Sequence, residues 1–143
     1  MSKSAALDAS HAVLDRVGLR ALAETPSTRI SGGEARRMTI ASTIVSAPDV
    51  VLFDEPTTGL DPAQRATVME LIREIGATKP TIVSTHEVDD LDDHYTNLAV
   101  LNHGEIAFYG SVRAFLEFGS AGLTNRLRAE DAYRTVLQRH EAR

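Results

Sequence analysis

An apolar run that ends in two carboxylates constrains the fold of this chain more than any other stretch: Val50-Val51-Leu52-Phe53-Asp54-Glu55-Pro56. Such a run of β-branched and aromatic residues predicts a short strand buried on both faces, as in a parallel sheet. In open α/β sheets, ligands bind beyond the carboxyl ends of the strands. Neighbouring side chains diverge from an extended backbone, so one of Asp54 and Glu55 could hold a cation while the other faces a reacting water. An acidic helix cap after a hydrophobic strand is the purely structural alternative.

Length and charge restrict the class of protein. The chain has 143 residues, a formal net charge of −5 and no cysteine. We expect one domain with its own core, without disulfides or thiolate metal sites, and no nucleic-acid partner, because that would need clustered basic charge. No apolar run approaches the roughly 18 residues that cross a bilayer, and the first residues lack the apolar region of a signal peptide. A cytoplasmic location is therefore expected.

A second motif, Ile30-Ser31-Gly32-Gly33-Glu34, precedes a predicted helix. Ser31 and Glu34 have the spacing of a capping box, which is a sufficient structural explanation for both residues. It does not explain the two glycines, which are poor helix formers. A helix N-terminus with a hydroxyl and no Cβ atoms in the way is also suited to bind an anion such as phosphate. The sequence leaves both interpretations open.

The segment after the carboxylates predicts a strand–helix–strand unit. Asp61-Pro62 is typical of a helix start, apolar residues recur with helical spacing up to Gly76, and residues 81–85 form a second β-branched strand that ends at His86. Such a unit implies parallel strands with a right-handed crossover. The three side chains that follow the strands are therefore expected on one edge of the sheet: Asp54, Glu55 and His86. His86 alone is more typical of a structural histidine than of a catalytic one.

The flanking regions predict mainly helices. Residues 4–17 and 125–143 are expected to be helical, residues 97–101 and 105–109 to form a hairpin, and Ser111 to cap a short helix. The acidic residues behind His86 lack the spacing of a calcium loop and indicate a solvated helical turn, with Val88 and Leu91 facing the core. These acidic residues are Glu87, Asp89, Asp90, Asp92 and Asp93.

Taken in order, these motifs resemble the C-terminal half of an ABC-type ATPase, the nucleotide-binding subunit of ATP-binding-cassette transporters. Residues 30–34 are similar to the signature motif (LSGGQ), residues 50–55 to the Walker B strand with its glutamate, residues 59–62 to the D-loop and residues 84–86 to the switch histidine. The resemblance runs from about residue 10 to residue 118 and implies an α/β fold: an incomplete P-loop NTPase (RecA-like) parallel sheet with flanking helices, plus part of the helical subdomain. It divides the chain into residues 1–46, 47–118 and 119–143.

The resemblance implies a role for each matching residue. ATP and Mg²⁺ would be the cofactors, with Asp54 holding the metal, Glu55 activating the attacking water and His86 contacting the γ-phosphate. Ser31, Gly32 and Gly33 would bind a nucleotide held by an opposing subunit, and Asp61 would link the two sites. Glu34 stands where the family usually has glutamine, and it adds a negative charge near a triphosphate unless it points at its own backbone.

The P-loop of the family is not found in this sequence. A phosphate-binding loop ends in Lys-Ser or Lys-Thr after glycine, and the only lysines here are Lys3 and Lys79. We therefore expect no ATPase activity from the chain alone, and an unfilled slot or two closed-up neighbours where the missing strand would lie. The expected partners are a P-loop-bearing half or subunit, a transmembrane transporter subunit at the inner face of the membrane, and a second copy in a functional dimer.

Two other interpretations stay open. The chain could be a non-catalytic module or truncated remnant that offers its signature helix to another ATPase. The head of a chromosome or DNA-repair ATPase also splits such motifs along its chain, but it would need long heptad repeats before residue 30, and none are present.

Overall fold

The computed structural model describes residues 2–88, 91 and 95–142. Their contacts divide the chain into two compact units, Met1–Ser84 and Thr85–Arg143. Each unit has its own hydrophobic core, so each is described separately. The expected division into three segments stays a prediction.

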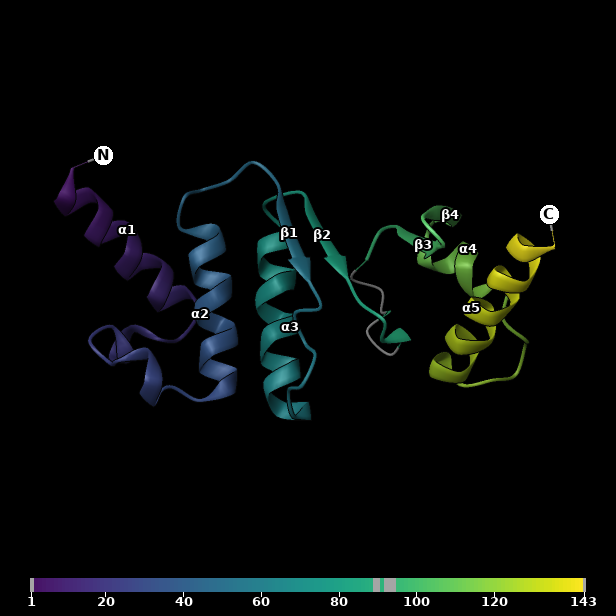
Figure 1. Cartoon of the computed structure of the whole chain (residues 1–143), viewed down its shortest axis with the longest axis horizontal. Helices are drawn as coiled ribbons and strands as arrows, with labels where there is room; N and C mark the ends of the chain where they lie inside the picture. Colours follow the sequence, from purple (N-terminus) through teal and green to yellow (C-terminus); the bar gives the residue numbers. More distant parts are fainter. Residues whose placement is uncertain (1, 89–90, 92–94, 143) are drawn as a thin grey trace. The chain divides into compact units, whose positions relative to one another are not determined.

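The first unit contains three helices and two strands (Figure 1). They are α1 (Lys3–Arg16), α2 (Gly32–Ile44), β1 (Val51–Asp54), α3 (Pro62–Gly76) and β2 (Thr81–Ser84), with 3₁₀ turns at Arg20–Leu22 and Ser27–Arg29. Gly18 follows α1 at φ +69°, a backbone conformation that glycine adopts without strain. At the start of α3 the Asp61 carboxylate accepts a hydrogen bond from the Gln64 N–H at 2.9 Å, as its sequence predicts.

The strands of the first unit pair in parallel, which confirms the predicted strand–helix–strand unit. Val51 and Phe53 are buried on the core side of the sheet, together with apolar residues of α2 and α3. Leu52 and Ile82 are register partners on the opposite face, and they are 64% and 58% exposed. The prediction that β1 is buried on both faces is therefore wrong, because the helices of this unit cover only one face of its sheet.

The second unit is a hairpin with two helices. Its elements are β3 (Leu98–Asn102), β4 (Glu105–Gly110), α4 (Val112–Leu116) and α5 (Asn125–Glu141). The hairpin turn places His103 and Gly104 at φ +50° and +83°, which is the geometry of a two-residue turn between twisted strands. Phe115, Ala132 and Val136 form the centre of the core, and Val88 and Leu91 pack against it as predicted.

Two further expectations concern the strands and the acidic segment. Among the described residues, β2 pairs with β1 and β3 pairs with β4. The expected slot or closed-up pair of strands involves both units and stays a prediction. The predicted helical turn lies outside the described residues, because it falls on Asp89, Asp90, Asp92 and Asp93.

None of the helices in the described ranges has both the length and the apolar character needed to span a membrane.

Candidate functional site

The sequence motifs of the first unit meet at one of its ends. The carboxyl ends of β1 and β2 and the N-termini of α2 and α3 all lie at this end (Figure 1). Two contacts connect the segments: an Arg36 Nη2 donates a hydrogen bond to the Thr58 carbonyl at 3.3 Å, and Gly33 lies against the side chain of Gln64. The turn that starts α2 and the loop that follows β1 are therefore neighbours.

Glu55 begins this loop in an unusual backbone conformation. Its φ is +47°, which costs a residue with a side chain about 1–3 kcal/mol and is most often kept at functional sites. The Glu55 N–H donates to both the carbonyl and the hydroxyl of Ser84 at 3.1 Å, and its carboxylate accepts from the Thr58 hydroxyl at 3.0 Å. Ser84 thus holds the backbone of Glu55, and Thr58 holds its carboxylate.

Asp54 is the last residue of β1, and its carboxylate lies on the open face of the sheet. The hydroxyl of Ser84, its register partner on β2, donates a hydrogen bond to it. Ser84 therefore connects the Asp54 carboxylate to the backbone of Glu55, because the same hydroxyl accepts from the Glu55 N–H. This fixes the orientation of Asp54 and leaves acceptor capacity on its carboxylate.

The start of α2 is a complete capping box. The Ser31 hydroxyl accepts from the Glu34 N–H at 3.3 Å, and the Ser31 N–H donates to the Glu34 carboxylate at 2.7 Å. The Ser31 backbone bond, and after it the Ser31 hydroxyl, hold the pKa of Glu34 below its ordinary value. Glu34 thus points at the backbone of its own turn. This is the second of the two arrangements expected from the sequence; in the first, its charge would face a triphosphate.

The two glycines of this turn differ in their surroundings. A Cβ atom on Gly33 would lie 2.6 Å from the Gln64 side chain, so Gly33 allows α2 to approach the start of α3 closely. Gly32 has open space where its Cβ would be, and both Ser31 and Gly32 are exposed. Packing accounts for Gly33, whereas the exposed side of the turn remains accessible to an outside molecule.

Asp61 and His86 have different positions. Asp61 caps α3 with its carboxylate and is exposed at the same end of the first unit. His86 belongs to the second unit, where it is exposed two residues after β2. The convergence of His86 with Asp54 and Glu55 stays a prediction.

The side chains at this end fit a magnesium–nucleotide complex. Mg²⁺ is usually bound by one or two carboxylates together with phosphate oxygens and water, and Asp54 is an exposed carboxylate of this kind. Three ligating side chains do not come together anywhere in the described part of the chain, so a cage made of protein ligands alone is not formed there. A metal at Asp54 would have to share its ligands with phosphate and water.

Sequence reasoning missed the residues that support the site. Ser84, Thr58 and Gln64 act through contacts with residues that the folded chain brings close, across β1 and β2 in the case of Ser84. Only the position of Ser84 at the end of a predicted parallel strand, level with Asp54, could have indicated its role.

Comparisons with known proteins agree with the resemblance. The family described as ABC transporter matches residues 3–58. An ABC transporter ATP-binding protein of Geobacter sulfurreducens is 38% identical over 117 residues, which are 82% of this chain and 45% of that protein. The arginine transport ATP-binding protein ArtP of Escherichia coli is 32% identical over 89% of this chain and 53% of its own length.

A solved structure shows the same fold. CbiO1 of Clostridium perfringens, part of the ABC transporter complex CbiONQ, superimposes with a TM-score of 0.74 at 27% identity. The match covers 82% of this chain and 47% of CbiO1. The chain therefore spans about half the length of the relatives that it matches.

Proposed function

Because this chain belongs to the family of ABC transporter ATP-binding subunits and spans part of their ATP-binding domain, we propose that it is the C-terminal part of a subunit that couples ATP hydrolysis to transport. One observation carries the proposal. The two strand-end carboxylates and the exposed turn at the start of α2 lie at the same end of the first unit (Figure 1). The two carboxylates could serve phosphoryl transfer, and the exposed turn could bind a phosphate.

The catalytic role falls on the end of β1. ATP with Mg²⁺ supplies the transferable phosphoryl group and neutralises its charge. Asp54 would hold the metal through its exposed carboxylate, and Glu55 would orient and deprotonate the attacking water. Two hydrogen bonds support this role: the Thr58 hydroxyl donates to the Glu55 carboxylate, and the Glu55 N–H donates to the Ser84 hydroxyl. A general base must keep its position while the proton is transferred. His86 would contact the γ-phosphate.

The turn at the start of α2 would serve a different nucleotide, one that is held by a partner subunit. Ser31, Gly32 and Gly33 would present the N-terminus of α2 to its γ-phosphate, and Asp61 would link the two sites. Glu34 now occupies the Ser31 N–H, so a phosphate would replace the Glu34 carboxylate at this donor. A glutamine could accept from the same N–H, but Glu34 also adds a negative charge that would repel the phosphate.

The P-loop would come from polypeptide outside these 143 residues, in the same protein or in a partner. Lys79 does not supply it, because it lies just before the start of β2, at the opposite end of the strand from Ser84, and its ammonium donates to the Pro48 carbonyl at 2.8 Å. The open face of the sheet, with Leu52 and Ile82, is where we expect the P-loop-bearing half to pack, since parallel sheets are normally covered on both faces. The assembled protein would lie in the cytoplasm, as a dimer against a transmembrane subunit.

The test is a Mg²⁺-dependent ATPase assay of the purified chain, alone and after co-expression with the P-loop-bearing half of the Geobacter relative. We expect hydrolysis only in the co-expressed form, and at least about a hundredfold slower hydrolysis with Glu55→Gln. Glu74→Gln, an exposed glutamate on α3, is the matched control and should retain full activity. ATPase activity of the chain alone, or co-expressed activity that tolerates Glu55→Gln, would overturn the proposal.

The alternative function, a non-catalytic binding module, rests on the lack of a P-loop in these residues. It predicts that the chain binds a P-loop-bearing partner in the presence of ATP without adding hydrolysis that depends on Glu55. The same co-expression experiment therefore separates the two functions.

A further inference from the structure

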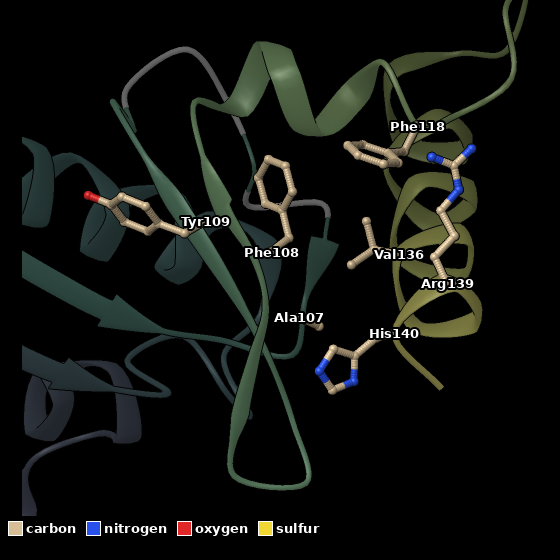
Figure 2. Close-up of a pocket in the computed structure, with 7 residues that line it drawn as sticks. All are labelled: Ala107, Phe108, Tyr109, Phe118, Val136, Arg139 and His140. Atoms are coloured by element: carbon tan, nitrogen blue, oxygen red, sulfur yellow. The ribbon is translucent and has the colours of Figure 1, made fainter. Parts of the chain in front are cut away.

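The second unit contains a cavity of about 360 Å³ that the nucleotide chemistry does not use (Figure 2). This volume lies within the range of small-molecule sites, which is about 300–1,000 Å³. Phe108 reaches the cavity from β4, Phe118 from the segment after α4, and Val136 from α5. Side chains from three separate elements thus contribute apolar surface to one partly open hollow.

The aromatic walls of the cavity are fixed by the core behind them. The Phe108 ring lies 5.6 Å from that of Phe115, which is only 1% exposed, and 5.5 Å from that of Phe118 in an edge-to-face arrangement. Aromatic pairs of this geometry are stabilised beyond their buried area. The apolar surface is therefore formed before any ligand arrives.

Two basic side chains from the last turn of α5 also line the cavity, and no acidic residue does. The Arg139 guanidinium lies 5.1 Å from the centre of the Phe118 ring, in a cation–π contact that orients it. No carboxylate pairs with Arg139 among the residues that the structure describes. His140 differs, because its Nε2 lies 3.4 Å from the Glu105 carboxylate. Among the residues that line this cavity, Arg139 is thus the one that can pair with a negative charge and donate hydrogen bonds to a ligand.

We propose that this cavity binds a small aromatic carboxylate. The ring of the ligand would pack among Phe108, Phe118 and Val136, and its carboxylate would accept two hydrogen bonds from Arg139. A planar guanidinium suits a carboxylate because two parallel N–H···O bonds can form at once. A neutral aromatic compound would leave the charge of Arg139 unpaired, and a cation would be repelled by it. The site is independent of the proposed ATPase function, since none of the residues that line it is among those proposed to bind or hydrolyse ATP.

The test uses 1-naphthoate as the probe and the full 143-residue chain, with binding followed by isothermal titration and by amide chemical shifts. We expect saturable binding with a dissociation constant below about 5 mM, and shifts at Phe108, Phe118 and the end of α5. Arg139→Gln should weaken binding by about tenfold or more, because a charge-assisted pair is lost. Arg134→Gln is the matched control: this arginine lies on the same helix, is 70% exposed and contacts Glu130 instead.

Two additional measurements distinguish a loss of binding from a loss of the fold. Ala107→Leu would fill the cavity from β4 and should abolish binding, while thermal unfolding shows whether each variant is intact. 1-Naphthamide, which has the same rings without the charge, should bind at least about tenfold more weakly than the acid. The proposal is overturned if naphthoate does not bind, if folded Arg139→Gln or Ala107→Leu binds it as well as the wild type does, if the amide binds equally well, or if the shifts map to the first unit.

Discussion

Glu55 depends on its neighbours for its position, because its backbone has a positive φ and its carboxylate accepts a bond from Thr58. We predict that Thr58→Val slows ATP hydrolysis in the co-expressed enzyme by about tenfold, since a hydrogen bond to a charged group contributes about 1.5–3 kcal/mol. Thr58→Ser keeps the hydroxyl and should retain the rate. Steady-state assays of both variants at saturating ATP test this. A loss of rate in the serine variant with none in the valine variant would mean that the methyl group, rather than the hydroxyl, supports Glu55.

Glu34 connects the stability of α2 to pH. Its pKa in the folded chain is depressed below the ordinary 4.5 by the Ser31 N–H and then by the Ser31 hydroxyl. A depressed pKa contributes stability that is present above the unfolded value and is lost as the pH falls through the folded value. We predict that Glu34→Gln is less stable than the wild type at pH 7, and that the difference disappears below the folded pKa of Glu34.

Urea unfolding of both proteins between about pH 3 and pH 7 measures this difference. Asp131, whose pKa is lowered by hydrogen bonds from the hydroxyl and then the N–H of Ser120, changes the stability of both proteins in the same direction. The comparison therefore isolates Glu34. A difference that is constant with pH would show that the Glu34 charge does not contribute to the capping box.

At the scale of elements, two glycines lie where two segments approach closely, and we expect the two sites to differ in how well they tolerate a side chain. A Cβ on Gly119 would lie 2.2 Å from the backbone carbonyl oxygen of Arg128 on α5, which cannot move without displacing the helix. We predict that Gly119→Ala costs about 1–3 kcal/mol of stability. Gly33→Ala should cost less, because the Gln64 side chain in its way is flexible at that end. Thermal unfolding of the two variants tests the order, which would be reversed if α2 and α3 were packed rigidly at this point.

Elements with strong local signals were predictable from sequence. The start of α3 follows from Asp61-Pro62, and the hairpin follows from the turn at His103 and Gly104. Both signals depend on residues that are adjacent in the chain. The hydrogen bonds of Ser84 were not predictable, since they depend on strand register. The apolar pattern of β1 was misleading in one respect: such a run is typical of a sheet covered on both faces, whereas Leu52 is exposed here.

This exposed face of the sheet leads to a prediction about assembly. Leu52→Lys should leave the thermal stability of the isolated chain nearly unchanged, because the side chain is already 64% exposed. It should weaken binding of the P-loop-bearing half by about tenfold or more, since burying a leucine contributes about 1.5–3 kcal/mol that a lysine cannot supply. Leu127→Lys on α5, at a site that is 48% exposed, is the control. Equal affinities of the two variants would show that the partner packs elsewhere.

At the scale of the whole molecule, the proposed roles assign Glu55 and Ser31 of one copy of the chain to two different nucleotides. Glu55 would act on the nucleotide held with its own copy, and Ser31 on the nucleotide of the opposing copy. In a symmetric dimer, each composite site therefore contains Glu55 from one copy and Ser31 from the other. Glu55→Gln and Ser31→Arg should each inactivate both sites of a dimer, Ser31→Arg by placing a large side chain on the exposed turn at the start of α2.

Mixing the two inactive variants, each co-expressed with the P-loop-bearing half, should then restore activity. A mixed dimer combines both defects in one site and leaves the other site intact, and random pairing makes about half of the dimers mixed. We therefore predict about a quarter of the wild-type ATPase rate after subunit exchange, although neither variant hydrolyses ATP alone. If Ser31 and Glu55 served the same nucleotide within one copy, every copy in the mixture would carry a defective site. The rate would then stay at the level of the separate variants, and the assignment of Ser31 to a partner's nucleotide would be wrong.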